Sequence, residues 1–248
     1  MAENSNLQFT PMKINRKFDE YKDGFKKGIP VCLGYISVSI TFGILATNGG
    51  LDIKTSVFIS ATNLTSAGQF AGLELIFNTA PYIELALTML VINIRYMLMS
   101  LSLSQKLSKE ISFLNRLLIS FGITDEIFSI ASLEKKKLTS HYMFGLITLP
   151  FIGWILGTYI GAVANKFLPS LIQDSFGIAI YGMFIALIVP PSKKSKAIFF
   201  VVLIAIFFSC CLYYLPYLNK ISQGFAIIIA SLLSSVLGAY FFPKKEEN

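Results

Sequence analysis

Long apolar stretches separated by short polar ones run along most of the chain. Each apolar stretch is close to the roughly 20 residues that a helix needs to cross a bilayer. The eight segments are Ile29–Ala46, Val57–Phe77, Tyr82–Leu103, Leu117–Leu133, Tyr142–Ala164, Leu171–Val189, Ala197–Leu215 and Ile221–Phe242. This pattern predicts an all-α, polytopic integral membrane protein with about eight transmembrane segments, or seven if the second segment is re-entrant.

The polar N-terminal stretch has neither an apolar core close to Met1 nor a small-residue cleavage site, so it does not read as a secretory signal. We expect residues 1–27 to form an uncleaved cytoplasmic tail. It forms either a short amphipathic helix on the membrane surface, built on Phe18, Tyr21 and Phe25, or a frayed segment. No polar stretch in the remainder is long enough for a linker, so residues 28–243 are predicted to form one permease domain.

Composition and charge agree with a membrane protein. Only 14% of the residues are charged, whereas a soluble domain carries about a quarter. The basic residues are scattered among short loops, which argues against nucleic-acid binding and favours topology signals. With eight spans and the N-terminus inside, 14 of the 21 Lys and Arg residues lie inside and six outside; with seven spans the counts are 11 and nine. The positive-inside rule, by which Lys and Arg concentrate on the cytoplasmic side, therefore favours eight spans. The protein is then a multi-pass protein of the cytoplasmic membrane with both termini in the cytoplasm, although Lys106, Lys109 and Arg116 lie outside.

A weak internal repeat relates the first and fifth segments. Pro30 and Phe42-Gly43 resemble Pro150 and Ile160-Gly161 in order and approximate spacing. Such a duplication would give two parallel halves of four segments each.

The third segment carries a basic residue, Arg95, inside an apolar run. A charge there costs at least a few kcal/mol unless it faces a cavity, a counter-charge or a ligand. Glu84, Thr88 and Arg95 lie on one stripe of a regular helix. Arg95 therefore either receives a carboxylate, from a substrate or a displaceable counter-charge, or belongs to a fixed ion pair between helices.

The second segment is too polar for a helix that faces lipid, since Ser60–Phe70 contains six hydroxyl or amide side chains. On a continuous helix Thr62, Ser66 and Gln69 would share one face. One interpretation is a broken helix that lines a substrate cavity. The alternative is hydrogen bonding between closely packed helices.

The fourth segment contains two adjacent carboxylates, Asp125 and Glu126, in a short apolar run. Adjacent carboxylates disfavour double ionisation, so one of them could hold a proton and couple transport to it. Alternatively, one pairs with Arg95 and the other reaches water. Gly122 could let this helix break.

The sequence offers no set of enzyme residues. It has no phosphate-binding loop of the G-x-x-x-x-G-K-[ST] type and no Ser/His pair in one buried region. The three cysteines lie in apolar runs without metal-ligand spacing. We therefore expect no enzymatic activity, no metal and no cofactor, and we expect a gradient to supply the energy for transport.

Six short sequence motifs follow one another over about residues 18–190. They are Phe25 with Gly28 and Pro30, Phe42-Gly43-Ile44-Leu45-Ala46, Gln69-Phe70, Asn93-Ile94-Arg95-Tyr96-Met97-Leu98-Met99, Thr124-Asp125-Glu126 and Trp154-Ile155-Leu156-Gly157-Thr158. Their order and spacing resemble the AzlC family, the larger subunit of branched-chain amino-acid exporters. The chain departs from the family pattern before the glutamine, where Thr65-Ser66-Ala67-Gly68 replaces a sequence resembling Ala-Gly-Ser-Ala.

The resemblance implies a membrane permease that exports leucine, isoleucine or valine, with methionine as a further candidate. It also implies a small membrane partner of the AzlD type and coupling to the proton motive force. In this hypothesis Arg95 receives the α-carboxylate, and Asp125 or Glu126 receives the α-amino group or the proton. The neutral binding candidates are Asn63, Ser66, Gln69 and Asn93, and the apolar side chain would lie near Phe70 and Met97. The rival hypotheses are a passive channel, a transporter of another small solute, and a scaffold subunit without transport.

Overall fold

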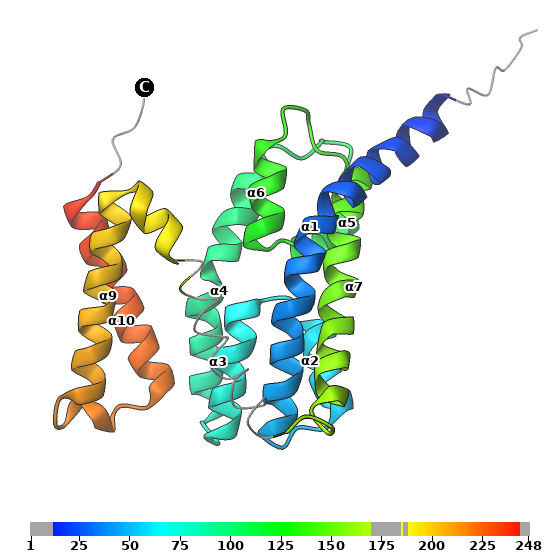
Figure 1. The fold of residues 1–248 in the computed structure, drawn as a ribbon. Coiled ribbons are helices and arrows are strands. Elements are labelled where there is room, and N and C mark those ends of the chain that lie inside the picture. Colours follow the sequence, from blue (N-terminus) through cyan, green and yellow to red (C-terminus); the bar gives the residue numbers. More distant parts are fainter. Residues whose placement is uncertain (1–11, 170–184, 186–187, 244–248) are drawn as a thin grey trace, which may run out of the picture. The chain divides into compact units, whose positions relative to one another are not determined.

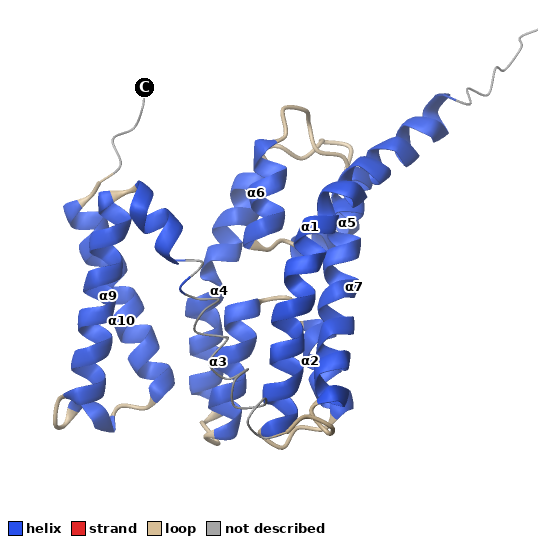
Figure 2. Cartoon of the chain, in the orientation of Figure 1, coloured by secondary structure: helices blue, strands red, loops and turns tan. Residues whose placement is uncertain are grey.

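The computed structural model describes residues 12–169, 185 and 188–243. Its elements are almost all helices (Figures 1 and 2). In chain order they are α1 (Met12–Asn48), α2 (Ile53–Thr62), α3 (Ser66–Phe77), α4 (Tyr82–Ser104), α5 (Phe113–Phe121), α6 (Asp125–Leu133), α7 (Ser140–Ala164), α9 (Lys196–Tyr214), the 3₁₀ turn η1 (Leu218–Lys220) and α10 (Gln223–Phe241). Within the described residues the only pairing of the strand type is one isolated bridge, between Leu107 and Leu138. The predicted all-α class is confirmed.

Five of these helices are long and apolar enough to cross a membrane: α1, α4, α7, α9 and α10. The predicted second and fourth segments are each divided into two short helices, α2 with α3 and α5 with α6. The predicted segment Leu171–Val189 lies almost entirely outside the described residues. The structure therefore confirms a polytopic helical protein with broken helices, but not a count of eight spans.

The chain divides into two compact units, and both α1 and α7 contribute to each of them. The first unit combines Met1–Ile36 with Tyr96–Trp154, and the second combines Ser37–Arg95 with Ile155–Asn248. Each unit therefore holds one of the two broken segments, with α5 and α6 in the first and α2 and α3 in the second.

Within each unit, α1 and α7 pack in parallel through glycines. In the first unit, a Cβ on Gly24 would lie 2.1 Å from the Tyr142 carbonyl oxygen, and one on Gly145 would lie 2.1 Å from the Tyr21 carbonyl oxygen. Exchanging the two helices converts one of these contacts into the other, since Tyr21 and Gly24 precede Tyr142 and Gly145 by the same number of residues. This offset is close to the offset of the weak repeat in the sequence. In the second unit, Gly161 meets the Ile40 carbonyl oxygen in the same way. Small residues that let two helix backbones approach explain this close packing.

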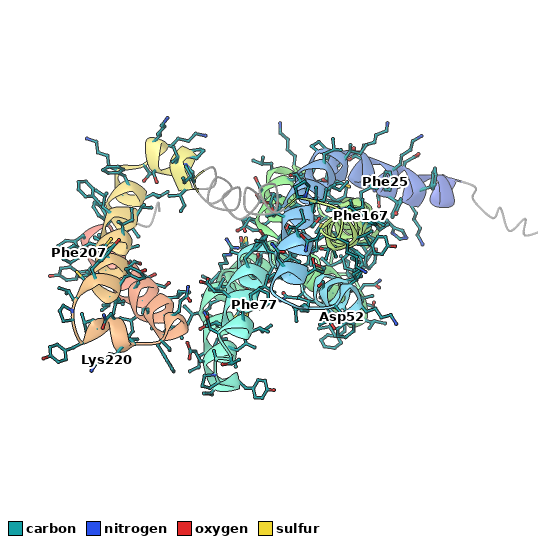
Figure 3. All side chains as sticks on the ribbon, turned by 60° about the horizontal axis from the view of Figure 1, so that its bottom comes forward. Phe25, Asp52, Phe77, Phe167, Phe207 and Lys220 are labelled. Atoms are coloured by element: carbon teal, nitrogen blue, oxygen red, sulfur yellow. The ribbon has the colours of Figure 1, made fainter. Side chains whose placement is uncertain are left out.

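In the second unit, α2 and α3 form a helical hairpin that starts and finishes near the C-terminal end of α1. Asp52 begins α2 just beyond the C-terminal end of α1, and Phe77 ends α3 (both are labelled in Figure 3). The Phe77 ring covers Gly49, which also lies at that end of α1. Between these ends, the Phe70 ring packs edge-on against Phe42 of α1, with 5.5 Å between centroids. Helix α3 therefore runs parallel to α1, and α2 runs antiparallel to it.

In the first unit, α5 and α6 form a second hairpin of the same kind. Lys106 in the loop before α5 donates to the carbonyl oxygens of Ser132 and Glu134 at the end of α6. The same loop holds Arg116 in the first turns of α5 through the Ser108 carbonyl oxygen, at 3.1 Å. The start of α5 and the end of α6 therefore lie at the same loop, which we call the open end of this hairpin. Gly122, the C-cap of α5, lies at the opposite end, the tip of the hairpin.

Residues 12–27 of the N-terminal tail are helical and continue directly into the first predicted span. Helix α1 continues without a break from Met12 to Asn48, with Pro30 inside it. At 1.5 Å per residue its 37 residues extend about 55 Å, longer than the roughly 30 Å of a hydrocarbon core. The predicted boundary between tail and permease domain at residues 27 and 28 therefore falls inside one helix.

Candidate functional site

The tip of the α2–α3 hairpin is a short extended link, Asn63-Leu64-Thr65. Asn63 has φ −141° and Thr65 has φ −126°, so neither residue adopts the left-handed conformation that favours glycine. The break therefore does not depend on a glycine, and the family glycine that Ser66 replaces is not needed for it here. Helix α2 has 10 residues and is about 15 Å long, so the tip would reach about half of the hydrocarbon thickness.

Neutral polar side chains hold this tip in place. Ser60 Oγ lies 2.7 Å from Thr158 Oγ1 of α7, and Gln69 Nε2 donates to Ser60 Oγ at 3.0 Å. Thr65 Oγ1 donates to Asn63 Oδ1 at 2.7 Å. All three interactions satisfy polar groups that would be costly to bury alone. The predicted broken helix and the predicted hydrogen bonding between helices therefore occur together.

Asn93 of α4 faces the first turn of α3. A Cβ on Gly68 would lie 3.0 Å from Asn93 Oδ1 and 3.2 Å from its Nδ2. Asn93 Oδ1 is buried and has no hydrogen-bond partner within the part of the chain that the structure describes. The first turn of α3 also carries backbone N–H groups without helical partners, so this corner offers hydrogen-bonding capacity to a polar ligand group.

A cavity of about 150 Å³ lies against the tip within the second unit. Its polar end is formed by Asn63 and Gln69, and glycines 68 and 72 also line it. The remaining lining is apolar: Phe42, Ile59, Leu73, Ile76, Leu85 and Met89. A site with one polar end and an apolar wall suits a small molecule that has a charged or polar head and a short hydrocarbon side chain.

The other predicted binding residues have different positions. Ser66 is the first residue of α3, next to the tip. Arg95 is half-buried on α4, has interactions of its own, and is not among the described residues that line the cavity. Phe70 packs in the buried cluster around Phe42, whereas Met97 is 62% exposed. We predicted that Phe70 and Met97 would surround the apolar side chain of the substrate. The apolar wall of the cavity is instead formed largely by residues that the sequence analysis did not select.

The tip of the α5–α6 hairpin lies in the first unit and carries the two predicted carboxylates. Thr124 caps α6, accepting a hydrogen bond from the Ile127 backbone N–H at 3.4 Å. Asp125 and Glu126 occupy the first turn of α6. Negative side chains are favoured there because backbone N–H groups point outward from a helix N-terminus.

Tyr35 of α1 joins this tip through its hydroxyl group. Tyr35 Oη lies 2.6 Å from Glu126 Oε2 and 2.5 Å from Thr124 Oγ1. A phenol has one hydrogen, so it can donate to only one of these oxygens. With an ionised Glu126, Tyr35 donates to the carboxylate and Thr124 donates to the phenol oxygen. With a protonated Glu126 the chain of hydrogen bonds can reverse.

Sequence reasoning missed Tyr35. The residue is buried, with 7% of its surface exposed, and its ring meets Trp154 edge-on at 5.3 Å. A buried tyrosine usually finds a partner for its hydroxyl group, and this was the available signal. Its partner could not be predicted, because Tyr35 and Glu126 are far apart along the chain.

Glu84 of α4 has a role that was not expected from the helix face it shares with Thr88 and Arg95. The carboxylate is 2% exposed, and it accepts a hydrogen bond from the Gly224 backbone N–H at 2.9 Å, at the start of α10. A Cβ on Gly224 would lie 2.6 Å from both Glu84 Oε1 and Thr88 Oγ1. Glu84 therefore caps α10, and this hydrogen bond offsets part of the cost of burying its carboxyl group.

Charged side chains also bind the open end of the α5–α6 hairpin to α1. Lys27 forms an ion pair with Glu134, and Tyr142 donates to the same carboxylate at 3.2 Å. The hydrogen bond from Lys27, more than any other contact, lowers the pKa of Glu134 from its usual value. Next to this pair is a cavity of about 750 Å³ whose lining includes charged side chains of both signs.

The described helices and their two tips are those of a polytopic membrane protein with two broken helices. The family model described as AzlC protein matches residues 30–168, more than half of the chain. This chain therefore belongs to the AzlC family.

Three relatives show how far the similarity extends. The chain is 25% identical over 176 residues to inner membrane protein YgaZ of Escherichia coli strain K12, covering 68% of this chain and 72% of that protein. It is 28% identical over 149 residues to an uncharacterized membrane protein of Helicobacter pylori strain J99, covering 59% and 64%. An uncharacterized membrane protein of Archaeoglobus fulgidus is 26% identical over 174 residues, covering 67% and 75%. No solved structure matches the chain. The relatives support a location in a membrane.

Proposed function

We propose that this protein is a secondary transporter that exports small apolar amino acids, namely leucine, isoleucine, valine and methionine, driven by the proton motive force. The observation that carries the proposal is the cavity at the α2–α3 tip, which combines amide groups with a hydrocarbon wall. Membership of the AzlC family supports the same class of function.

Substrate binding is assigned to the second unit. The cavity would take the hydrocarbon side chain, and Asn63 and Gln69 at its polar end would bind the head group. The buried Asn93 Oδ1 would accept a hydrogen bond from the α-amino group, because it lacks a partner among the described residues. Ser66 at the start of α3 would bind the α-carboxylate in the cavity. Arg95 on α4 lies outside the described lining of the cavity and would contact the α-carboxylate on its way to or from the site.

Proton coupling is assigned to the first unit. Asp125 and Glu126 share the first turn of α6, and Glu126 belongs to the hydrogen-bonded chain with Tyr35 and Thr124. Gain or loss of a proton at Glu126 would reverse the direction of those hydrogen bonds. Such a chain is a reasonable element for a protein that responds to the proton gradient.

The two hairpins suggest a topology of six crossings and two re-entrant pairs, in place of eight crossings. Helices α1, α4, α7, α9 and α10 would cross, and the sixth crossing would be the segment Leu171–Val189 that the sequence predicts and that lies almost entirely outside the described residues. If the N-terminus is cytoplasmic, the loops before α5 and after α6 then lie inside, as does the C-terminus. Only Lys54, Lys166 and Lys220 would lie outside, with Arg95 in the membrane and every other Lys or Arg inside. The positive-inside rule supports this arrangement more strongly than eight crossings, and it removes the conflict posed by Lys106, Lys109 and Arg116.

Two further assignments belong to the proposal, and family membership supports them. The protein would reside in the cytoplasmic membrane, and it would work with a small membrane subunit of the AzlD type. Reconstitution with and without such a subunit tests the second assignment directly.

The test of the transport function is leucine counterflow in proteoliposomes. The wild type should exchange internal unlabelled leucine for external labelled leucine with saturation. Arg95→Gln should reduce the exchange about tenfold, which corresponds to the loss of one charge-assisted hydrogen bond of roughly 1.4 kcal/mol. Arg16→Gln is the matched control, since the Arg16 side chain is 82% exposed. Wild-type exchange in Arg95→Gln would remove the role of Arg95.

The same experiment separates the rival functions. A passive channel gives leucine flux but no counterflow. A scaffold subunit gives no transport alone. A transporter of another solute gives no leucine exchange but responds in a screen of small solutes.

A further inference from the structure

The inference concerns the apolar wall of the cavity at the α2–α3 tip, and it rests on the proposed function. Two glycines one turn apart on α3, Gly68 and Gly72, face α4. Glycines with this spacing usually allow two helices to pack closely. The structure gives these two glycines different surroundings.

At Gly68 the space is filled. A Cβ there would lie 2.6 Å from Thr65 Oγ1 and 3.0 Å from Asn93 Oδ1. Any larger residue would displace the side chains that form the polar tip. Close packing therefore fully explains the glycine at position 68.

At Gly72 there is room for one methyl group. The nearest atoms to a Cβ there are the Met89 Cε and Sδ, both at 3.6 Å, and Leu85 Cδ1 at 3.8 Å. These are ordinary van der Waals distances, so an alanine would fit without moving its neighbours. Gly72 lies within α3 and does not have a positive φ, so its backbone does not require glycine either.

A glycine inside a helix costs about 0.5–1 kcal/mol compared with alanine. At Gly72 neither packing nor backbone conformation accounts for that cost. The residue also lines the cavity together with Leu85 and Met89. What the glycine preserves is the space in the cavity wall.

Met89 is the opposite side of that space. Its unbranched thioether side chain has several rotatable bonds and adapts to irregular surroundings. It precedes Asn93 by four residues on α4, so both lie on the face of α4 that meets α3. The polar contact at Asn93 and the apolar contact at Met89 are therefore one helical turn apart.

We propose that Gly72 and Met89 determine the size of the aliphatic side chain that the transporter accepts. The amino-acid head group binds at the polar end of the cavity, and the side chain extends into the space beside Gly72. Gly72→Ala adds one carbon to the wall and removes room for about one carbon of substrate. Leucine and valine differ by one methylene group, so this change should separate them.

The experiment is competition counterflow in proteoliposomes, with labelled valine and unlabelled alanine, valine, isoleucine, leucine and methionine as competitors. One methylene in an apolar pocket changes selectivity about 10- to 200-fold. Gly72→Ala should therefore lower the preference for leucine over valine at least about tenfold while retaining valine exchange. Met89→Ala should shift the preference toward leucine and methionine. Gly34→Ala is the matched control, because a Cβ at Gly34 of α1 has no heavy atom within 4 Å.

The outcomes are separable. An unchanged order of competitors in both variants, with active exchange, overturns the role of Gly72 and Met89 and leaves the transport function intact. Absence of exchange of every apolar amino acid by the wild type overturns both. If Gly72→Ala is folded but inactive, the order measured with Met89→Ala decides: a shift toward larger substrates supports the proposal, and no shift overturns it.

Discussion

The two hairpin tips are alike in length and opposite in chemistry. Each is a three-residue interruption between short helices, Asn63-Leu64-Thr65 in one unit and Gly122-Ile123-Thr124 in the other. In both, a threonine is the residue before the second helix. The α2–α3 tip carries only neutral amides and hydroxyls and has a cavity beside it, whereas the α5–α6 tip carries two carboxylates.

The difference extends to how each tip is held. At the α2–α3 tip, Gln69, Ser60 and Thr158 form a buried chain of neutral hydrogen bonds. At the α5–α6 tip, Tyr35 contacts both Thr124 and Glu126, so one ionisable group is part of the support itself. A neutral tip can bind a zwitterion without responding to pH, while a tip supported through a carboxylate must respond to its protonation.

The largest expected effect is at the carboxylate tip. Glu126→Gln should reduce leucine transport driven by a pH gradient roughly 100-fold, because an amide cannot gain or lose the proton. Leucine counterflow at equal pH should remain within about threefold of the wild type. Glu110→Gln, at an exposed carboxylate, is the control. Equal loss of both activities would place Glu126 in substrate binding.

A change outside both tips should act on stability alone. Gly224→Ala places a methyl group 2.6 Å from Glu84 Oε1 and Thr88 Oγ1 and should disrupt the cap of α10. We expect the free energy of unfolding to fall by about 2 kcal/mol, the cost of leaving a buried polar group unsatisfied. Thermal unfolding in detergent measures this, and the leucine KM should not change. A changed KM would extend the substrate site to α10.

At the neutral tip, Gln69→Leu should raise the leucine KM about tenfold, since it removes the hydrogen bond to Ser60 and a polar group of the cavity. The pH dependence of transport should keep its shape. Gln105→Leu, at an exposed position, is the control. A pH profile displaced by Gln69→Leu would contradict the separation of the two tips.

Tyr35→Phe tests the support of the carboxylate tip. Removing the hydroxyl group deletes the contacts with Glu126 and Thr124 and should destabilise the protein by about 1 kcal/mol. Gradient-driven transport should fall about threefold with a displaced pH profile, a readout that a purely structural role would not change. Tyr213→Phe, at a side chain that is 73% exposed, should have no effect.

The smallest expected effect is at the open end of the same hairpin. The pKa of Glu134 is lowered in the folded protein, so its carboxylate stabilises the fold above the ordinary glutamate pKa. This contribution is lost as the pH falls through the lowered value. Glu134→Gln should therefore reduce stability by at most about 1 kcal/mol at pH 7, since the pair is partly exposed. The difference from the wild type should shrink in acid, and a difference that is constant with pH would contradict the role of the ion pair.

The sequence predicted the class of fold and both helix breaks. Hydrophobic length predicted the membrane helices, and polar residues in apolar runs indicated where the second and fourth segments would break. The sequence could not show that each broken segment folds into a hairpin. A short helix has the same composition whether the chain goes on in the same direction after it or reverses. That information lies in contacts between distant residues, such as Phe77 with Gly49.

The candidate site was predicted less completely than the fold. Asn63, Gln69 and Asn93 could be singled out because an amide in a membrane segment is costly. Gly72 and Met89 could not, because glycine and methionine are ordinary residues in membrane helices. Tyr35 and Gly224 acquire their roles only from partners far away in the chain. The spatial relation of Arg95 to Asp125 and Glu126 stays a prediction, since these residues belong to different units.

The most direct test of the separation between the two tips is one paired assay on the same proteoliposomes: labelled-leucine counterflow at equal pH, then leucine transport driven by a pH gradient. Glu126→Gln should retain counterflow and lose gradient-driven transport, whereas Gln69→Leu should weaken both in proportion. Loss of counterflow in Glu126→Gln, or wild-type counterflow at low leucine in Gln69→Leu, would contradict the assignment of substrate to one tip and proton to the other.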